Sequence, residues 1–262
     1  MTIATWRRTS IRLAVCGLAI AGYAGLCAVA ARTASAAPTF TYKTTAYPIP
    51  GFPGTGDILG ASALFQLQGK ISGSEYGGFP PPLIGIKYYG PAGAKQSPEG
   101  FATCAPNVIE KEGPGLCPKR SIAGPQGFGV GVVSFGDERV QERASIQPFF
   151  ASGGNLEFFV DGKTPVSLEI LSIGHVVNSP PPFGPTTIGE VPLIETVPGA
   201  LDASVEEATI RVGAAYRQGK KTISYLTVPK TCPKGGLPTK VELSFLGGAT
   251  AEASYKMPCP RK

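Results

Sequence analysis

Cysteine is the residue type whose number and spacing point most directly to chemistry. Beyond residue 36 the chain holds four: Cys104, Cys117, Cys232 and Cys259. An even number in an exported chain predicts two disulfides. Three pairings are possible, and we expect neighbours in the sequence to pair, each bond contributing about 2–4 kcal/mol. A four-thiolate zinc site is the weaker interpretation, because its C-x₂₋₄-C spacing is absent.

Side chains that could act in catalysis are scarce. The one histidine, His175, lies in the apolar run 170–177, and we interpret it as a structural strand residue rather than a general base. The chain has no G-x-S-x-G nucleophile elbow. It also has no H-E-x-x-H motif and no D-x-D-x-D-G calcium loop. We therefore predict no catalytic residue, no metal site and no cofactor.

Carboxylates offer the remaining route to catalysis. The adjacent pairs Asp137-Glu138 and Glu206-Glu207 would point to opposite faces of a strand, so neither pair would converge on one ion. Two of the 18 carboxylates could instead meet across a cleft and hydrolyse a glycan. The sequence does not identify such a pair. A secreted, glycan-directed hydrolase is thus the alternative to a protein with a binding or structural role.

Aromatic side chains form the candidate binding surface. Tyr76, Phe79, Tyr88 and Tyr89 lie in the Pro/Gly-rich first part of the chain. Such side chains offer large apolar faces for a sugar or a protein, although tyrosines beside Pro and Gly can equally close the end of a sandwich. Both interpretations stay open. The partner that we expect is a cell-envelope glycan or another protein.

Short β-type segments alternate with turn signals beyond residue 36. Apolar and polar residues trade places in 64–68 and 241–245, as burial of one face requires. The best helical candidate is the short segment 200–207. We therefore predict an all-β chain folded as an antiparallel β-sandwich, one large or two small, with a subdivision near 153–154. The expected strands are 40–45, 61–71, 83–89, 128–135, 140–149, 156–160, 166–177, 190–197, 208–216, 222–228, 239–245 and 250–256.

Turn residues punctuate these segments. Asp161-Gly162 lies between two expected strands and predicts a hairpin. The runs Pro80-Pro81-Pro82 and Pro180-Pro181-Pro182 must lie in loops or at strand edges, because proline cannot donate to a sheet. We interpret both as rigid loops rather than as ligands for a polyproline-binding protein.

The first 36 residues have the organisation of a cleavable signal peptide. Three arginines precede an apolar stretch over 13–31, and Ala34-Ser35-Ala36 offers small residues where a signal peptidase cuts. A retained transmembrane anchor is the alternative. We expect cleavage after Ala36, which leaves residues 37–262 as a protein secreted or held at the cell envelope. No integral membrane span would then remain.

Most of the net charge of +6 belongs to this segment. The segment holds four of the 24 basic residues and none of the 18 acidic ones, so 20 basic and 18 acidic residues remain after cleavage. Binding to a nucleic acid needs a clustered basic face. The longest basic run is Lys220-Lys221, and we exclude nucleic acid as a partner.

Two groups of strings span nearly the whole chain beyond residue 36. They are Pro81-Pro82-Leu83-Ile84-Gly85-Ile86, Gly100-Phe101-Ala102-Thr103-Cys104, Gly113-Pro114-Gly115-Leu116-Cys117-Pro118-Lys119, Val228-Pro229-Lys230-Thr231-Cys232-Pro233-Lys234-Gly235-Gly236 and Tyr255-Lys256-Met257-Pro258-Cys259-Pro260. These strings resemble a group of uncharacterised secreted β-rich proteins of soil-type actinobacteria. The resemblance implies an exported β protein with cysteines in the same two places, and it brings no activity. Gly115-Leu116 departs from the group, which has smaller residues there.

Overall fold

The computed structural model describes residues 37–49, 51–52, 58–135, 138–165, 167–193 and 203–260. The predicted signal peptide and Asp137 of the first acidic pair lie outside these ranges. The strands are β1 Thr39–Pro48, β2 Ala63–Ser72, β3 Leu83–Pro91, β4 Lys95–Gln96, β5 Gly127–Phe135, β6 Glu138–Phe150, β7 Leu156–Gly162, β8 Leu168–Asn178, β9 Phe183–Glu190, β10 Ala203–Val212, β11 Ala215–Gln218, β12 Lys221–Ser224, β13 Leu226–Thr227, β14 Leu237–Phe245 and β15 Thr250–Met257.

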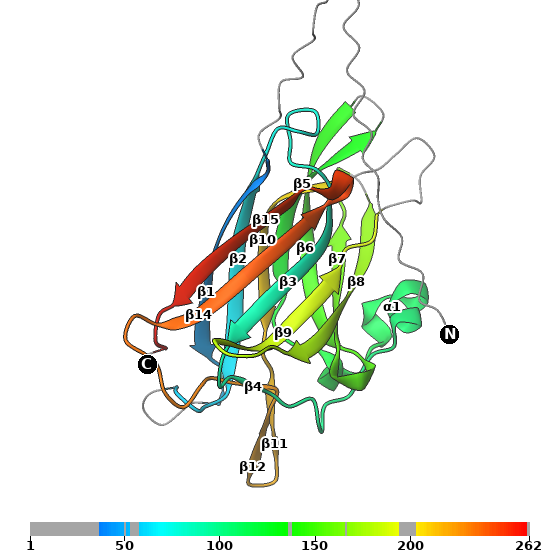
Figure 1. The fold of residues 1–262 in the computed structure, drawn as a ribbon. Coiled ribbons are helices and arrows are strands. Elements are labelled where there is room, and N and C mark those ends of the chain that lie inside the picture. Colours follow the sequence, from blue (N-terminus) through cyan, green and yellow to red (C-terminus); the bar gives the residue numbers. More distant parts are fainter. Residues whose placement is uncertain are drawn as a thin grey trace, which may run out of the picture. The chain divides into compact units, whose positions relative to one another are not determined.

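Most of these strands form a single antiparallel sheet in the order β1-β2-β10-β5-β6-β7-β8-β9-β3-β14-β15. The sheet curls until its two edge strands, β1 and β15, lie side by side (Figure 1). At this junction the rings of Tyr42 and Tyr255 lie 5.8 Å apart. The hydroxyl groups of Tyr42 and Thr239 form a hydrogen bond of 2.9 Å between β1 and β14. The sheet is therefore nearly closed.

The predicted all-β antiparallel class is confirmed. The two facing layers expected of a sandwich belong here to one continuous sheet, whose opposite walls pack on each other. Leu67 and Ile71 of β2 share an apolar cluster with Leu243 of β14, for example. Gly153 and Gly154 lie in a short 3-10 turn, and the strands on either side of it, β6 and β7, pair with each other.

The best helical candidate, 200–207, is not helical where the structure describes it, because residues 203–207 belong to strand β10. This strand pairs with β2 on one side and β5 on the other, so tertiary pairing overrides the local preference. The strand predicted over 190–197 is also misplaced. Residues 191–193 are not a strand, and β9 precedes them. Pro185 gave residues 183–190 the composition of a loop in the sequence. In the structure it lies near the start of strand β9.

The hairpin predicted at Asp161-Gly162 exists, but its turn lies further along the chain. Both residues still belong to β7 and pair with Glu169 and Leu168 of β8. Both triple-proline runs lie between strands, as predicted: one precedes β3 and the other connects β8 with β9.

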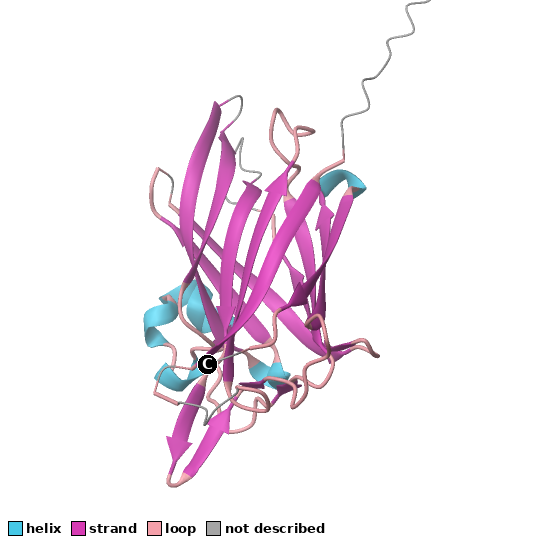
Figure 2. Cartoon of the chain, turned by 90° about the vertical axis from the view of Figure 1, so that its left-hand side faces the viewer, coloured by secondary structure: helices cyan, strands magenta, loops and turns pink. Residues whose placement is uncertain are grey.

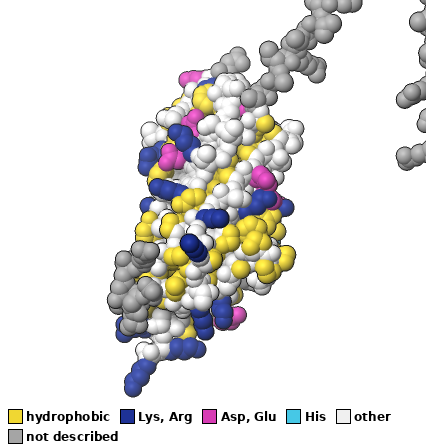
Figure 3. All heavy atoms as spheres, turned by 60° about the vertical axis from the view of Figure 1, so that its left-hand side comes forward, with side chains coloured by type: hydrophobic (Ala, Val, Ile, Leu, Met, Phe, Trp, Pro, Cys, Tyr) yellow, Lys and Arg dark blue, Asp and Glu magenta, His cyan; other side chains and the backbone are white. Residues whose placement is uncertain are grey.

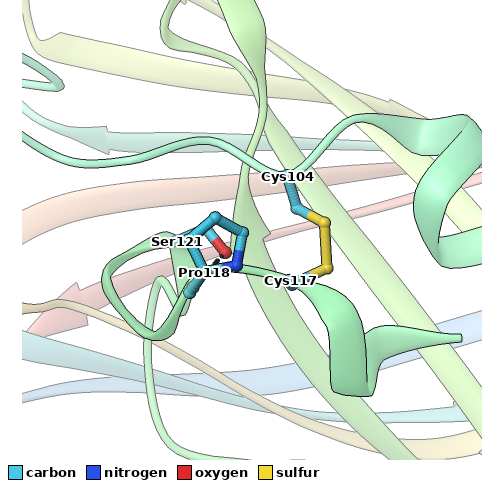
Figure 4. Close-up of a disulfide and its surroundings, with 4 residues drawn as sticks. All are labelled: Cys104, Cys117, Pro118 and Ser121. Atoms are coloured by element: carbon cyan, nitrogen blue, oxygen red, sulfur yellow. Dashed lines mark hydrogen bonds between the residues drawn. A yellow bond between two sulfur atoms is a disulfide. The ribbon is translucent and has the colours of Figure 1, made fainter.

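Residues 104–121, which we call the outer cover, pack against the outside of strands β6 to β8. They contain α1 (Pro106–Glu112) and the 3-10 turns Pro114–Leu116 and Lys119–Ser121. Figure 2 shows these helical segments beside the sheet. The Cys104–Cys117 disulfide closes the segment, and just beyond it the Ser121 hydroxyl donates to the Pro118 carbonyl at 2.7 Å (Figure 4). A seven-residue helix is too short to show a 3.6-residue apolar pattern, which is why the sequence did not predict it.

The second disulfide joins Cys232 to Cys259, so both predicted pairings are confirmed. It connects the segment before β14 with the segment that follows β15. The hairpin of β11 and β12 projects from one end of the sheet (Figure 1). Arg217, Lys220 and Lys221 are exposed on it, and Figure 3 shows Lys and Arg side chains at this tip. Elsewhere on that face, charges of both signs are scattered.

Candidate functional site

A row of small residues crosses five neighbouring strands of the sheet. Direct partners in register are Gly69 of β2, Ala208 of β10, Gly129 of β5, Ala144 of β6 and Gly162 of β7. Residues directly opposite each other in an antiparallel pair point to the same face. This small-residue row faces the interior of the sheet. Since no member carries more than a methyl group, the row leaves the interior underfilled.

A cavity of about 260 Å³ occupies the interior beside this row. For comparison, an engineered apolar cavity of about 150 Å³ binds benzene. The side chains of Leu67, Ile86 and Phe158 face the cavity and keep an intermediate accessibility even though they point inward. The lining is almost entirely apolar, and its large side chains include Phe40, Phe65, Leu67, Ile71, Leu83, Ile86, Ile146, Leu156, Phe158, Ile170, Ile210 and Leu243.

Three polar atoms at this lining have no hydrogen-bond partner within the part of the chain described: Thr44 Oγ1, Tyr88 Oη and Gln96 Oε1. Thr44 is 0% exposed. Burial raises the pKa of Tyr88, and the nearby Thr44 hydroxyl offsets this rise in part. The hydroxyl groups of Thr44 and Tyr88 therefore lie close to each other inside an apolar cavity.

Glu142 brings a carboxylate to the same lining. Its side chain is buried, and its Oε1 accepts a hydrogen bond of 3.3 Å from the backbone N–H of Thr164, in the segment that follows β7. It lies beside Gly162, where a side chain would collide with it. Glu142 thus occupies space that the small-residue row leaves free at β7.

A second buried carboxylate, Glu157, lies on the opposite face of the sheet. Its neighbours in β7, Leu156 and Phe158, line the cavity, so the alternation of the strand points Glu157 outward, toward the outer cover. Glu157 is 0% exposed, and neither carboxylate oxygen has a hydrogen-bond partner among the residues described. Burial, with a smaller contribution from Glu110 of α1, raises its pKa to about 7.

The two buried carboxylates are therefore not a catalytic pair, because Glu142 points into the sheet and Glu157 points out of it. A shallower groove lies outside the sheet, between the outer cover and strands β6 and β7. Its lining mixes polar and apolar groups, including Gln147 and Ile122, and it does not include Glu157. No cluster of three or more His, Cys, Asp or Glu side chains suited to a metal occurs in the described ranges.

The structure divides the predicted aromatic surface. Tyr76 and Phe79 lie in the loop before β3, where the Tyr76 N–H donates to the Phe79 carbonyl at 2.9 Å. Tyr88 points into the cavity. Tyr89 points to the outside, donates a hydrogen bond of 3.0 Å to Glu242 and lies against Phe183. His175 is exposed on the outer face of β8.

Sequence reasoning missed the interior as a site. Its residues are apolar or small, and they come from segments far apart in the chain. One local signal was present: Gly127, Gly129 and Gly131 alternate along β5, which places glycine repeatedly on one face of a strand. Nothing in the sequence around Thr44 indicated that its side chain would line a binding site.

None of the helices described is long and apolar enough to cross a membrane. Comparison of the chain with protein-family models, with curated proteins and with solved structures finds no match.

Proposed function

We propose that this chain is an exported protein that binds one small, largely apolar ligand inside its nearly closed sheet. The observation that carries the proposal is the cavity beside the small-residue row. Protein interiors are normally packed as densely as organic crystals. Along a cavity of about 260 Å³ the apolar walls lack these packing contacts and are left unfavourably exposed. A ligand that fills the cavity restores these contacts and removes its own apolar surface from water.

Export is supported by two independent features. The first 36 residues have the pattern of a signal peptide. The four cysteines beyond them form two disulfides, which persist in oxidising compartments. The resemblance to secreted actinobacterial proteins agrees with this placement. The ligand would then be bound outside the cell or at the cell envelope.

Titration with N-phenylnaphthylamine, a neutral dye whose fluorescence rises in apolar surroundings, tests the proposal. We expect saturable binding to the chain beginning at Ala37. Replacing Ala208 or Ala144 with leucine fills the cavity from the small-residue row and should weaken binding at least about tenfold, since a leucine in this space removes contact area from the dye.

The matched control is Ser145→Leu, which adds the same side chain to β6 on the opposite face. It should bind the dye as the unchanged protein does. Circular dichroism of each variant establishes that the sheet has formed. The proposal fails if the unchanged protein does not bind the dye, or if folded Ala208→Leu and Ala144→Leu proteins bind it equally well.

A further inference from the structure

The cavity holds two hydroxyl groups that its own walls leave unpaired. Thr44 lies on β1 and Tyr88 on β3, strands that are not neighbours in the sheet, and both side chains line the cavity. The two hydroxyls interact at most weakly with each other, and neither has another hydrogen-bond partner among the residues described. A buried polar group without a partner destabilises the fold, so a partner supplied from the cavity would be bound favourably.

Two nearby hydroxyl groups, on strands β1 and β14 of the same wall of the sheet, do find hydrogen-bond partners. The Tyr42 and Thr239 hydroxyls bond to each other at 2.9 Å, and the Thr239 hydroxyl also donates to the Tyr255 carbonyl at 3.1 Å. Tyr42 lies two residues before Thr44 on the same strand. On this wall the Tyr42 and Thr239 hydroxyls are thus paired, whereas the Thr44 and Tyr88 hydroxyls, which line the cavity, are not.

The charge of the lining restricts the ligand. No Lys, Arg or His is among the described residues that line the cavity, whereas Glu142 is. A carboxylate or phosphate would therefore be buried without a cation among the described residues of the lining, at a high desolvation cost. A neutral hydroxyl or carbonyl group avoids this cost. A hydroxyl side chain can both donate and accept, so it can bind either group.

We propose that the ligand is a neutral amphiphile, an apolar chain or ring system with one hydroxyl or carbonyl group, and that the hydroxyls of Thr44 and Tyr88 bind this group. The inference rests on the proposed function and adds the chemical class of the ligand. Thr44 and Tyr88 would fix its orientation, while the apolar lining would hold the rest of the molecule.

Displacement of N-phenylnaphthylamine by decane, decanol and decanoate tests the inference. The three compounds share a chain length and differ in the terminal group. We expect Tyr88→Phe and Thr44→Val each to weaken decanol binding about fivefold to tenfold and to leave decane binding unchanged, because only decanol uses the hydroxyls. Decanoate should displace the dye more weakly than decanol does.

Tyr42→Phe is the matched control, since it removes a hydroxyl that is already paired and does not line the cavity. The ratio of decanol to decane affinity should stay as in the unchanged protein. The inference is wrong if Tyr88→Phe and Thr44→Val leave this ratio unchanged, or if decanoate binds more tightly than decanol. If neither decane nor decanol displaces the dye, the proposed function itself fails.

A bound ketone of the same chain length supplies a second measurement. Its carbonyl stretching frequency in the infrared should shift downward on binding, as hydrogen bonding weakens the C=O bond. Tyr88→Phe should reverse most of that shift while the ketone still binds. A frequency that is equal in the two proteins contradicts the role assigned to Tyr88.

Discussion

Strand β7 separates two buried regions that differ in how completely they are filled. On its inner face Leu156 and Phe158 line a cavity, whereas on its outer face Glu157 and Phe159 lie beneath the outer cover. Both regions bury polar groups that have no described partner. In the cavity there is room for a ligand to supply one. Beneath the outer cover the group without a partner is the Glu157 carboxyl, whose burial cost falls when it takes up a proton.

This difference assigns different properties to the two faces. The polar groups of the cavity that lack a described partner, the Thr44 and Tyr88 hydroxyls and the Gln96 amide oxygen, are neutral, and a ligand can remove their cost. The outer face holds an ionisable group, whose cost depends on pH. Ligand binding and pH should therefore act on opposite sides of the same strand. The following predictions test this comparison.

The largest effect is expected from removing the bond that closes the outer cover. The double variant Cys104→Ala/Cys117→Ala frees a loop with a sequence separation of 13 residues. Its free energy of unfolding at about pH 5, measured with urea, should fall by about 3 kcal/mol. Because water then reaches Glu157, the dependence of stability on pH should also weaken.

The control for this variant is Cys232→Ala/Cys259→Ala, which opens the other disulfide, whose Cys232 packs against a different apolar cluster from that of Cys104 and Cys117. It should lose a comparable free energy of unfolding and keep the dependence on pH. Equal dependence on pH in both double variants would show that the outer cover does not shield Glu157.

A smaller effect is expected from Glu157 itself. Its pKa rises from 4.5 to about 7 on folding, so the folded chain holds the proton more tightly than the unfolded chain does. The stabilisation is complete below about pH 4.5 and is lost as the pH rises through about 7. Urea unfolding of Glu157→Gln should remove this decline and give a protein about 2 kcal/mol more stable than the unchanged one at about pH 8.

Replacing Glu110 sharpens the result. Glu110→Gln removes only the smaller cause of the raised Glu157 pKa. The free energy of unfolding should therefore still fall with rising pH, but over a slightly lower pH range. A Glu157→Gln protein whose stability still falls between pH 5 and 8 as steeply as that of the unchanged protein would contradict the assignment to Glu157.

The smallest effect separates paired from unpaired hydroxyls. Tyr42→Phe removes a hydrogen-bonded hydroxyl and should lower the free energy of unfolding by about 1 kcal/mol. Tyr88→Phe removes an unpaired one and should change the ligand-free protein by less than about 0.5 kcal/mol. Urea unfolding of both variants measures the difference. Equal losses would mean that the Tyr88 hydroxyl already has a partner in the folded chain.

The features that could be predicted from the sequence are those that short segments determine. Alternation of apolar and polar residues identified most strands, and the close spacing within each cysteine pair indicated both disulfides. The errors arose where pairing with strands far away in the sequence determines the secondary structure. Residues 203–207 are a strand because β2 and β5 pair with β10, and nothing within that segment requires it.

The candidate site lay beyond the sequence for the same reason. Tyr88 and Tyr89 looked alike as neighbouring aromatics, and only the pairing of β3 with its neighbours sends one inward and the other outward. Thr44 became notable only because its hydroxyl meets Tyr88 across strands that are not adjacent.

By itself the sequence determined the all-β class and which residues share a face of each strand, because side chains alternate between the two faces along any strand. It favoured the observed cysteine pairing among three possible ones. The tertiary structure alone decided that Gly69, Ala208, Gly129, Ala144 and Gly162 meet in one row and open a cavity. The physical reason is register: a shift of one residue between two strands would send half of that row to the outside.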